Sequence, residues 1–191
     1  LVQNVGDGYS FPLGIAYISA SMKAAGYKVF TLNLNHHEGK VSEIIKKEIE
    51  DYRIDAVATG GLSFQYATIR EVIESAKQAD SKIITIVGGG IITSDPETAM
   101  EALEYADYGV IGEGEISIRE LCNALENGGD FAKINGLIYK DGNGYKKTSP
   151  REEIMDLDFL PWPDYEGFEL KKFILISPSI CVVIRKNTVF M

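Results

Sequence analysis

The chain has 191 residues, 45% of them hydrophobic, which is enough for one full domain and an attached segment. Acidic residues outnumber basic ones by 28 to 19, and the resulting formal charge of −9 argues against a nucleic-acid partner. No apolar run approaches the roughly 18 residues of a membrane span, so we expect no membrane partner. The first residues show neither an initiator Met nor a secretory signal, and we expect a fragment that begins inside a strand.

The two cysteines lie far apart in the sequence and do not indicate a disulfide framework. A reducing, cytoplasmic setting fits this usage better. Cys122 shares helical spacing with Ile118, Leu121 and Leu125, so we predict that it is a buried apolar residue.

Strands and helices alternate over the first two-thirds of the chain. Apolar, β-branched runs predict five strands, at residues 1–3, 28–34, 55–59, 82–87 and 108–111. Helical spacing predicts amphipathic helices up to Gly26, at 41–52, at 67–77, from Asp95 and at 116–126. Ser10 is expected to cap the first helix, with Pro12 in its first turn. We therefore predict an α/β fold over residues 1–130, a doubly wound five-stranded parallel sheet of Rossmann-like or flavodoxin-like type.

The last third of the chain has a different character. Residues 131–155 are predicted as a β-hairpin extension, because two strand-like runs flank Asp141-Gly142-Asn143-Gly144. From residue 156 to 191 the periodicity is lost. Pro161, Trp162 and Pro163 predict an extended linker with an anchoring aromatic, followed by the truncated start of another domain.

Glycine-rich loops follow four of the five predicted strands. They are Gly6-Asp7-Gly8-Tyr9, Gly60-Gly61-Leu62-Ser63, Gly88-Gly89-Gly90 and Gly112-Glu113-Gly114-Glu115. In such sheets a ligand binds beyond the carboxyl ends of the strands, and glycine lets the backbone approach it closely. These loops favour a wide slot for a bulky ligand. The alternative is that the glycines serve only the turns.

Common nucleotide motifs are absent from these loops. The G-x-G-x-x-G spacing fails because Gly8 is followed next by Gly14, and no acid closes the second strand. A P-loop would need G-K-[ST], and a phosphoacceptor domain would need Asp where Thr59 stands. All three functions are disfavoured.

Four segments together show a resemblance to a known domain family. Tyr9-Ser10-Phe11-Pro12-Leu13-Gly14, Lys23–Val29, Val87–Gly90 and Gly112–Glu115 resemble the cobalamin-binding domain at the N-terminus of B12-dependent radical SAM enzymes. The hairpin and the Leu157–Pro163 linker are similar to the segment that joins this domain to the radical SAM barrel, so the resemblance covers residues 1 to about 168. It implies cobalamin as cofactor and the barrel of the parent chain as partner. In the full-length enzyme it also implies S-adenosylmethionine and a [4Fe–4S] cluster.

The resemblance also implies a set of cofactor-binding residues: Tyr9, Ser10, Phe11, Leu13, Gly14, Gly60, Gly61, Leu62, Ser63, Gly88, Gly89, Gly90, Gly112, Glu113 and Gly114. Cobalamin domains of the methionine-synthase type carry D-x-H-x-x-G, whose His coordinates cobalt from below. Aligned on Gly14, this chain has Tyr9 for the Asp and Phe11 for the His. The implied corrin site therefore has no histidine as lower ligand.

Other polar candidates are weighed separately. His36 and His37 follow the second strand, where we predict a solvated loop and no metal site. Glu113 and Glu115 are interpreted as a structural or ligand-contacting turn at a helix N-terminus, and not as an acid–base pair. Cys181 falls where the first thiolate of a cluster motif is expected, but Arg185 and Thr188 stand at the second and third positions.

The sequence thus predicts a cobalamin-binding module of a B12-dependent radical SAM enzyme, of methyltransferase or oxidative cyclase type. We expect the chain alone not to be catalytic. One alternative is a scaffold or substrate-recognition domain of the same fold that has lost the cofactor. Another is a flavodoxin-like domain that binds flavin.

Overall fold

A computed structural model describes residues 11–142 and 144–170 of the chain, together with the backbone of residues 180–185. The first strand, expected at residues 1–3, lies outside these residues. The described strands are β1 (Lys28–Asn33), β2 (Ala56–Gly60), β3 (Ile84–Gly88), β4 (Tyr108–Val110), β5 (Leu137–Asp141), β6 (Gly144–Lys147) and β7 (Ile180–Arg185). The helices are α1 (Leu13–Ala24), α2 (Val41–Tyr52), α3 (Tyr66–Ala79), α4 (Gly90–Ser94), α5 (Pro96–Ala102) and α6 (Gly114–Asn127).

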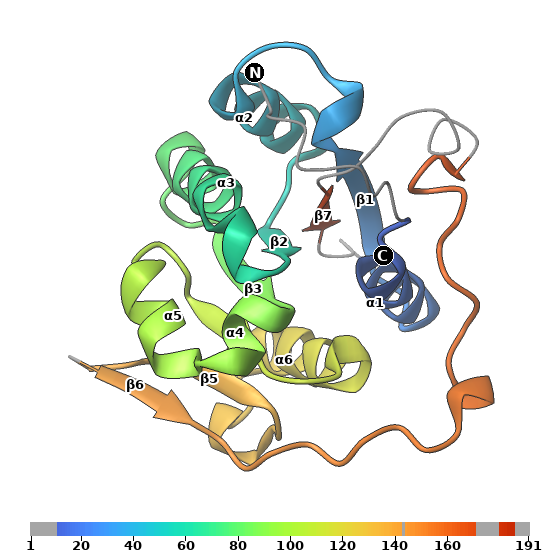
Figure 1. Cartoon of the computed structure of the whole chain (residues 1–191), viewed down its shortest axis with the longest axis vertical. Helices are drawn as coiled ribbons and strands as arrows, with labels where there is room; N and C mark the ends of the chain where they lie inside the picture. Colours follow the sequence, from blue (N-terminus) through green and yellow to red (C-terminus); the bar gives the residue numbers. More distant parts are fainter. Residues whose placement is uncertain (1–10, 143, 171–179, 186–191) are drawn as a thin grey trace.

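The strands form one open sheet in the order β1-β7-β2-β3-β4-β5-β6 (Figure 1). β2, β3 and β4 are parallel, and β1 shares their direction because β7 is antiparallel to both of its neighbours. This confirms the α/β fold with a mostly parallel open sheet. The predicted hairpin is also present, and it extends the sheet because β5 pairs antiparallel with β4.

The strand β7 differs from expectation. Residues 156–191 were predicted as a linker and the start of another domain, but Ile180–Arg185 forms a strand in the interior of the sheet. It fills the position between β1 and β2, with Cys181 opposite Leu32 on one side and Thr59 on the other. Sequence patterns locate strands but not their partners, so this pairing had no local signal.

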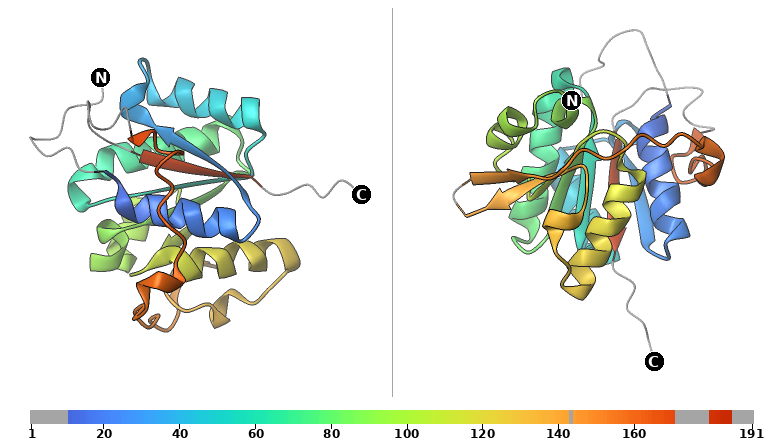
Figure 2. Two further views of the ribbon diagram at one scale, coloured as in Figure 1. Left: turned by 90° about the vertical axis from the view of Figure 1, so that its right-hand side faces the viewer. Right: turned by 90° about the horizontal axis from the view of Figure 1, so that it is seen from below.

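Helices cover both faces of the sheet (Figure 2). α1 and α6 pack on one face around Met22, Ile118 and Leu121, and Cys122 is buried in the same cluster, as predicted. α2 and α3 pack on the other face, where α4 and α5 continue the layer. Because apolar side chains occupy both sides of the central strands, the sheet is doubly wound.

Local signals set several helix ends. The side chain of Asp95 accepts a hydrogen bond from the N–H of Thr98, and Pro96 is the first residue of α5, as the sequence predicts. Gly128 ends α6 in the left-handed conformation, with φ of 71°. α1 begins at Leu13 directly after Pro12, whereas Ser10, the expected cap, lies outside the described residues.

The extended segment after β6 passes around the edge of the domain to α1 (Figure 1). Trp162 is 85% exposed, so the expectation that it anchors this segment is wrong. The anchors are Phe168, which is 1% exposed, and Asp164. The carboxylate of Asp164 accepts hydrogen bonds from Ser19 Oγ and Lys23 Nζ, both at 2.5 Å, and its backbone N–H donates to the carbonyl of Ala16.

These contacts determine the protonation of Asp164. Burial by itself would raise the pKa of the Asp164 carboxyl, but hydrogen bonds from Lys23, Ser19 and the N–H of Gly167 outweigh it. The pKa is therefore lowered from its usual value, and the carboxylate stays ionised where it holds the segment.

Candidate cofactor-binding cleft

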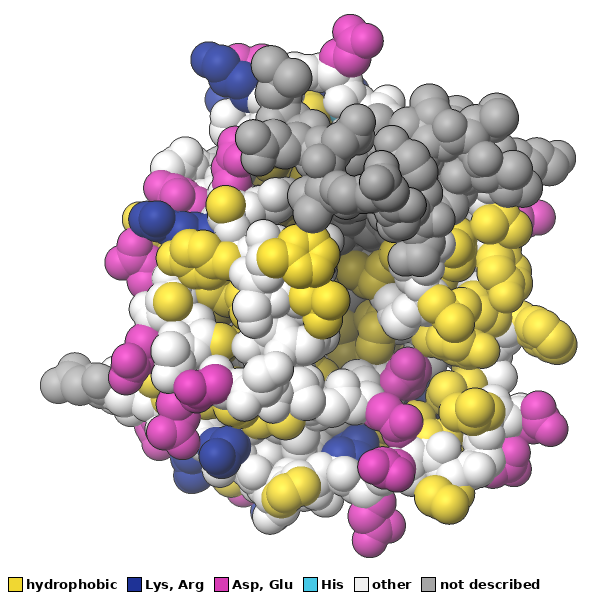
Figure 3. Space-filling view, in the orientation of Figure 1, with side chains coloured by type: hydrophobic (Ala, Val, Ile, Leu, Met, Phe, Trp, Pro, Cys, Tyr) yellow, Lys and Arg dark blue, Asp and Glu magenta, His cyan; other side chains and the backbone are white. Residues whose placement is uncertain are grey.

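A cleft of about 550 Å³ opens at the carboxyl ends of β2, β3 and β4, between the start of α1 and the start of α6. Its volume is that of a typical ligand site, and its position is the one where open parallel sheets bind ligands. Figure 3 shows hydrophobic atoms around a hollow on this face of the molecule. The fold therefore places the candidate site at the edge that the glycine loops predict.

The cleft brings together most of the residues that the sequence predicts for the site. Those in its lining are Leu13, Gly14, Gly60, Gly61, Leu62, Gly88, Gly89, Gly90, Gly112, Glu113 and Gly114. Phe11 and Ser63 are not among the lining residues, and Tyr9 and Ser10 lie outside the described ones.

The middle glycines of the cleft pack on each other. A Cβ on Gly60 would lie 2.5 Å from the carbonyl oxygen of Gly88, and one on Gly89 would lie 2.9 Å from the backbone of Gly61. The N–H of Ile91 donates to the carbonyl of Gly61 at 2.9 Å, which holds the loops after β2 and β3 together. These glycines allow close contact between the two loops, which is a structural role distinct from both ligand contact and turn formation.

Two other glycines face open space. A Cβ on Gly14 or on Gly112 would meet no described heavy atom within 4 Å. Gly14 lies in the first turn of α1, and Gly112 has φ of 73° in the loop after β4. These two positions form the mouth of the cleft and leave room for a ligand.

The deeper walls of the cleft are apolar, and the sequence-based site did not include them. They come from α1, α6 and the strand ends, and consist of Ile15, Ile18, Ala58, Ile86, Val110 and Ile118; Pro12, Thr59 and Gln65 complete the lining. Helical or strand periodicity marks such residues as core and does not reveal whether the space beside them is filled. The small side chain of Ala58, in the middle of β2, is the one local hint.

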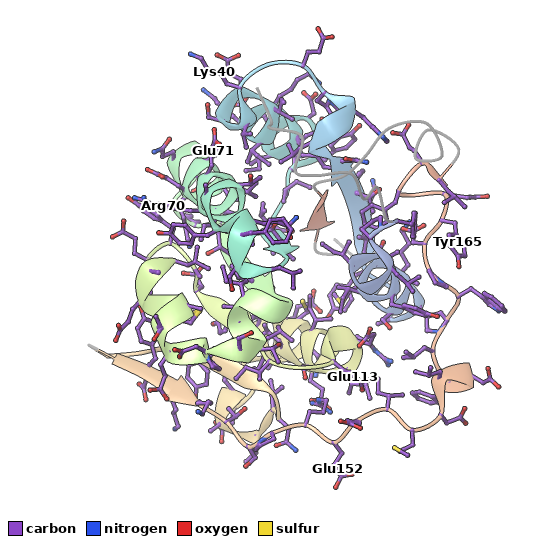
Figure 4. All side chains as sticks on the ribbon, viewed as in Figure 1. Lys40, Arg70, Glu71, Glu113, Glu152 and Tyr165 are labelled. Atoms are coloured by element: carbon purple, nitrogen blue, oxygen red, sulfur yellow. The ribbon has the colours of Figure 1, made fainter. Side chains whose placement is uncertain are left out.

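Few polar side chains line the cleft, and two of them accept hydrogen bonds from backbone N–H groups. Gln65 Oε1 accepts a hydrogen bond from the N–H of Leu62, and Glu113 Oε2 accepts one from the N–H of Ile154 at 2.6 Å. Glu113 thereby ties the extended segment to the start of α6 (Figure 4). Glu115, which also lines the cleft, has one buried carboxyl oxygen without a partner among the described residues.

Burial raises the pKa of the Glu115 carboxyl, and the nearby charge of Glu113 raises it further. The backbone N–H groups of Glu115 and Gly114 act in the opposite direction without cancelling the shift. The two acids therefore differ: Glu113 has a structural partner, whereas Glu115 is a desolvated carboxyl at the wall of the cleft.

Phe11, aligned with the histidine of methionine-synthase-type domains, packs against the extended segment. Its ring lies 5.3 Å from that of Tyr165 and 6.3 Å, edge-on, from that of Phe168. Tyr165 is labelled on that side of α1 in Figure 4. Phe11 thus helps to dock the segment on α1, and it is not part of the cleft wall.

Neither histidine lines the cleft. His37 is exposed, as predicted for a solvated loop, but the prediction is wrong for His36. The His36 side chain is 5% exposed, with Nδ1 2.8 Å from Glu169 and Nε2 3.2 Å from the amide of Asn33. Within the described residues, no group of three or more His, Cys, Asp or Glu side chains could hold a metal ion.

The described helices include none that is both long and apolar enough to cross a membrane.

The model of the B12-binding domain family matches residues 2–122, which is more than half of the chain. The chain belongs to this family. The match spans the glycine loops, and it includes α1 and most of α6, the two helices that flank the cleft.

Curated relatives of this B12-binding domain are longer proteins. An uncharacterised methyltransferase of Pyrococcus horikoshii is 29% identical over 164 residues, which is 85% of this chain and 35% of that protein. The anaerobic magnesium-protoporphyrin IX monomethyl ester cyclase of Synechocystis sp. is 25% identical over 175 residues, 91% of this chain and 35% of the cyclase. The chain thus spans about a third of the length of these relatives.

Solved structures share the fold. TsrM from Kitasatospora setae, a radical S-adenosylmethionine methyltransferase solved with cobalamin and a [4Fe–4S] cluster bound, matches with a TM-score of 0.65 at 22% identity. The match covers 74% of this chain and 28% of TsrM. OxsB, a cobalamin-dependent S-adenosylmethionine radical enzyme, matches with a TM-score of 0.64 at 19% identity, over 85% of this chain and 23% of OxsB.

Proposed function

We propose that this B12-binding domain holds cobalamin at the cleft between α1 and α6. The observation that carries the proposal is the cleft itself, which lies at the ligand-binding edge of the sheet and contains eleven of the predicted site residues. The family match supports the same cofactor.

The shape of the cleft fits one part of cobalamin. Its volume of about 550 Å³ is sufficient for the nucleotide tail but not for the corrin as well. The tail would lie against the apolar walls of Ile18, Val110 and Ile118, and the corrin would cover the mouth beside Gly14 and Gly112. Bound there, cobalamin supplies a cobalt centre for methyl transfer or radical chemistry, while these residues bind and orient it.

The lower face of the corrin would meet no protein histidine. Neither His36 nor His37 lines the cleft, and Phe11 packs on Tyr165 and Phe168. Among the described residues of the cleft, the corrin would therefore meet mainly apolar side chains and glycine backbone, in keeping with the missing D-x-H-x-x-G motif.

We further propose that the domain acts within a longer B12-dependent radical SAM enzyme, a methyltransferase or an oxidative cyclase. Support comes from relatives of which this chain spans about a third, two of them a methyltransferase and a cyclase. In such an enzyme a further domain would supply S-adenosylmethionine and a [4Fe–4S] cluster, since Arg185 and Thr188 replace two of the expected thiolates. The chain alone would bind cobalamin without turnover.

Hydroxocobalamin binding tests the proposal. The purified chain is incubated with excess hydroxocobalamin, desalted, and its visible spectrum is recorded at micromolar concentration. We expect about one retained corrin per chain and, after reduction to Co(II), an electron paramagnetic resonance spectrum without the nitrogen splitting of an axial imidazole. A protein that retains no corrin contradicts cobalamin binding and favours the scaffold alternative, whereas a flavin that copurifies favours the flavodoxin-like one.

A further inference from the structure

Four residues with polar side chains line the cleft: Thr59, Gln65, Glu113 and Glu115. Gln65 and Glu113 both accept hydrogen bonds from backbone N–H groups, and Thr59, 7% exposed, lies at the end of β2. Glu115 differs from Gln65 and Glu113: its Oε2 atom is shielded from solvent, and no donor among the described residues reaches it.

An unpartnered buried carboxyl oxygen is costly. Hydrogen bonds to water are lost on burial, and the loss is larger for a charged group than for a neutral one. The neighbouring Glu113 adds to the cost by repulsion, as the raised pKa of Glu115 reflects. Nothing in the described fold compensates Oε2, although the backbone N–H groups of Gly114 and Glu115 approach the carboxyl group.

The position of Glu115 indicates where a compensating donor would come from. The residue lines the cleft at the first turn of α6, next to the open mouth at Gly112. The last torsion of a Glu side chain is soft, so a small rotation exposes the second oxygen to the cleft. A ligand in the cleft can then donate to it while the helix N-terminus holds the first.

We propose that Glu115 is a specificity-determining residue, which accepts a hydrogen bond from a neutral N–H or O–H group of the ligand. This rests on the proposed function, in which the ligand is cobalamin. The corrin rim carries primary carboxamides and the nucleotide tail carries hydroxyls, and both are neutral donors. The phosphate of the tail has no proton to donate at neutral pH and would be repelled by Glu113 and Glu115, so it must lie away from the start of α6.

The test compares Glu115→Gln with the wild-type chain in cobalamin affinity. Glutamine keeps the shape and can still accept from the backbone N–H groups, but it presents an amide N–H to the ligand donor. We expect cobalamin to bind 10- to 100-fold more weakly, the range for a lost hydrogen bond to a charged group. Glu43→Gln is the matched control, because Glu43 also lies in the first turn of a helix but is exposed and is not among the lining residues of the cleft.

The stability of the cofactor-free protein gives an independent readout. Replacing this desolvated charge, whose Oε2 has no partner among the described residues, should raise the melting temperature of the apo Glu115→Gln variant by about 2–4 °C. A residue with a purely structural role would lower both stability and affinity, whereas we expect the two to move in opposite directions. An affinity within threefold of wild type overturns the role of Glu115. A wild-type chain that binds no cobalamin overturns the proposed function instead.

Two kinds of cobalamin analogue identify the donor. Cobinamide lacks the nucleotide, so a Glu115→Gln effect that disappears with cobinamide places the donor on the tail. An effect that persists places it on a corrin carboxamide or on the aminopropanol amide that cobinamide keeps, and the first case can be tested with a carboxylic acid analogue. In that case the corrin monocarboxylic acid altered at this carboxamide should bind weakly to the wild type, and Glu115→Gln should bind it more tightly than the wild type does.

Discussion

The loops around the cleft use glycine in two ways. After β2 and β3, Gly60 and Gly89 press against the backbone of the neighbouring loop, and a methyl group at either position would collide with it. At the start of α1 and after β4, Gly14 and Gly112 face open space. A count of glycines at a sheet edge therefore overstates the room for a ligand, because only the second kind provides it. Glycines of the first kind let the loops after β2 and β3 pack closely on each other at the base of the cleft.

The largest expected effect is a loss of stability at the closely packed glycines. Gly60→Ala places a methyl group 2.5 Å from the backbone oxygen of Gly88, which cannot move without disturbing the pairing of β2 with β3. We expect a loss of about 2–3 kcal/mol in the free energy of unfolding, measured by urea denaturation. Gly144→Ala, where a Cβ meets no described atom within 4 Å, is the control. An unchanged urea midpoint for Gly60→Ala would show that the backbone around Gly60 and Gly88 can shift to accommodate a methyl group.

A substitution at Gly14, which faces open space, should lower the affinity for cobalamin without lowering the stability of the fold. Gly14→Leu directs a large side chain into the mouth of the cleft, and we expect cobalamin affinity to fall at least tenfold. The fold should be unharmed, because replacing glycine inside a helix gains about 0.5–1 kcal/mol. Isothermal titration and thermal melting of Gly14→Ala and Gly14→Leu separate the two effects. Full affinity for the leucine variant would place the ligand elsewhere.

The smallest effect concerns backbone conformation. Gly112 has φ of 73° but faces open space, so a side chain there is strained without being crowded. Gly112→Ala should cost about 1 kcal/mol, whereas Gly112→Asn should cost less because asparagine tolerates the left-handed region. Melting curves of the two variants would rank them, and equal losses would indicate that space, not φ, decides at this position.

Sequence reasoning predicted the elements whose signals are local. α2 was predicted at residues 41–52, its observed bounds, because its apolar stripe faces the core without interruption. Asp95 and Pro96 marked the start of α5, because a capping side chain and a first-turn proline are also local signals. The short helix α4 was missed, since five residues carry less than two turns of periodicity.

The sequence predicted the loops around the cleft but not the apolar side chains of its deeper walls. Glycines and Glu113 mark the loops, but Ile18 and Ile118 have the periodicity of ordinary core residues. Whether two facing helices close on each other or leave a space depends on how they pack, which no single segment encodes. The interior position of β7 is non-local in the same sense, because its partners lie more than 100 residues earlier in the chain.

Helix α1 contacts both the cleft and the extended segment. Gly14 at one end lines the cleft, and Lys23 near the other end holds Asp164 of the extended segment. At about 1.5 Å per residue, these two positions lie roughly 14 Å apart along the helix axis. The length of α1 thus helps to fix where the extended segment lies relative to the cleft. A single inserted residue in the middle of α1 would turn one end by about 100° relative to the other and misalign the two.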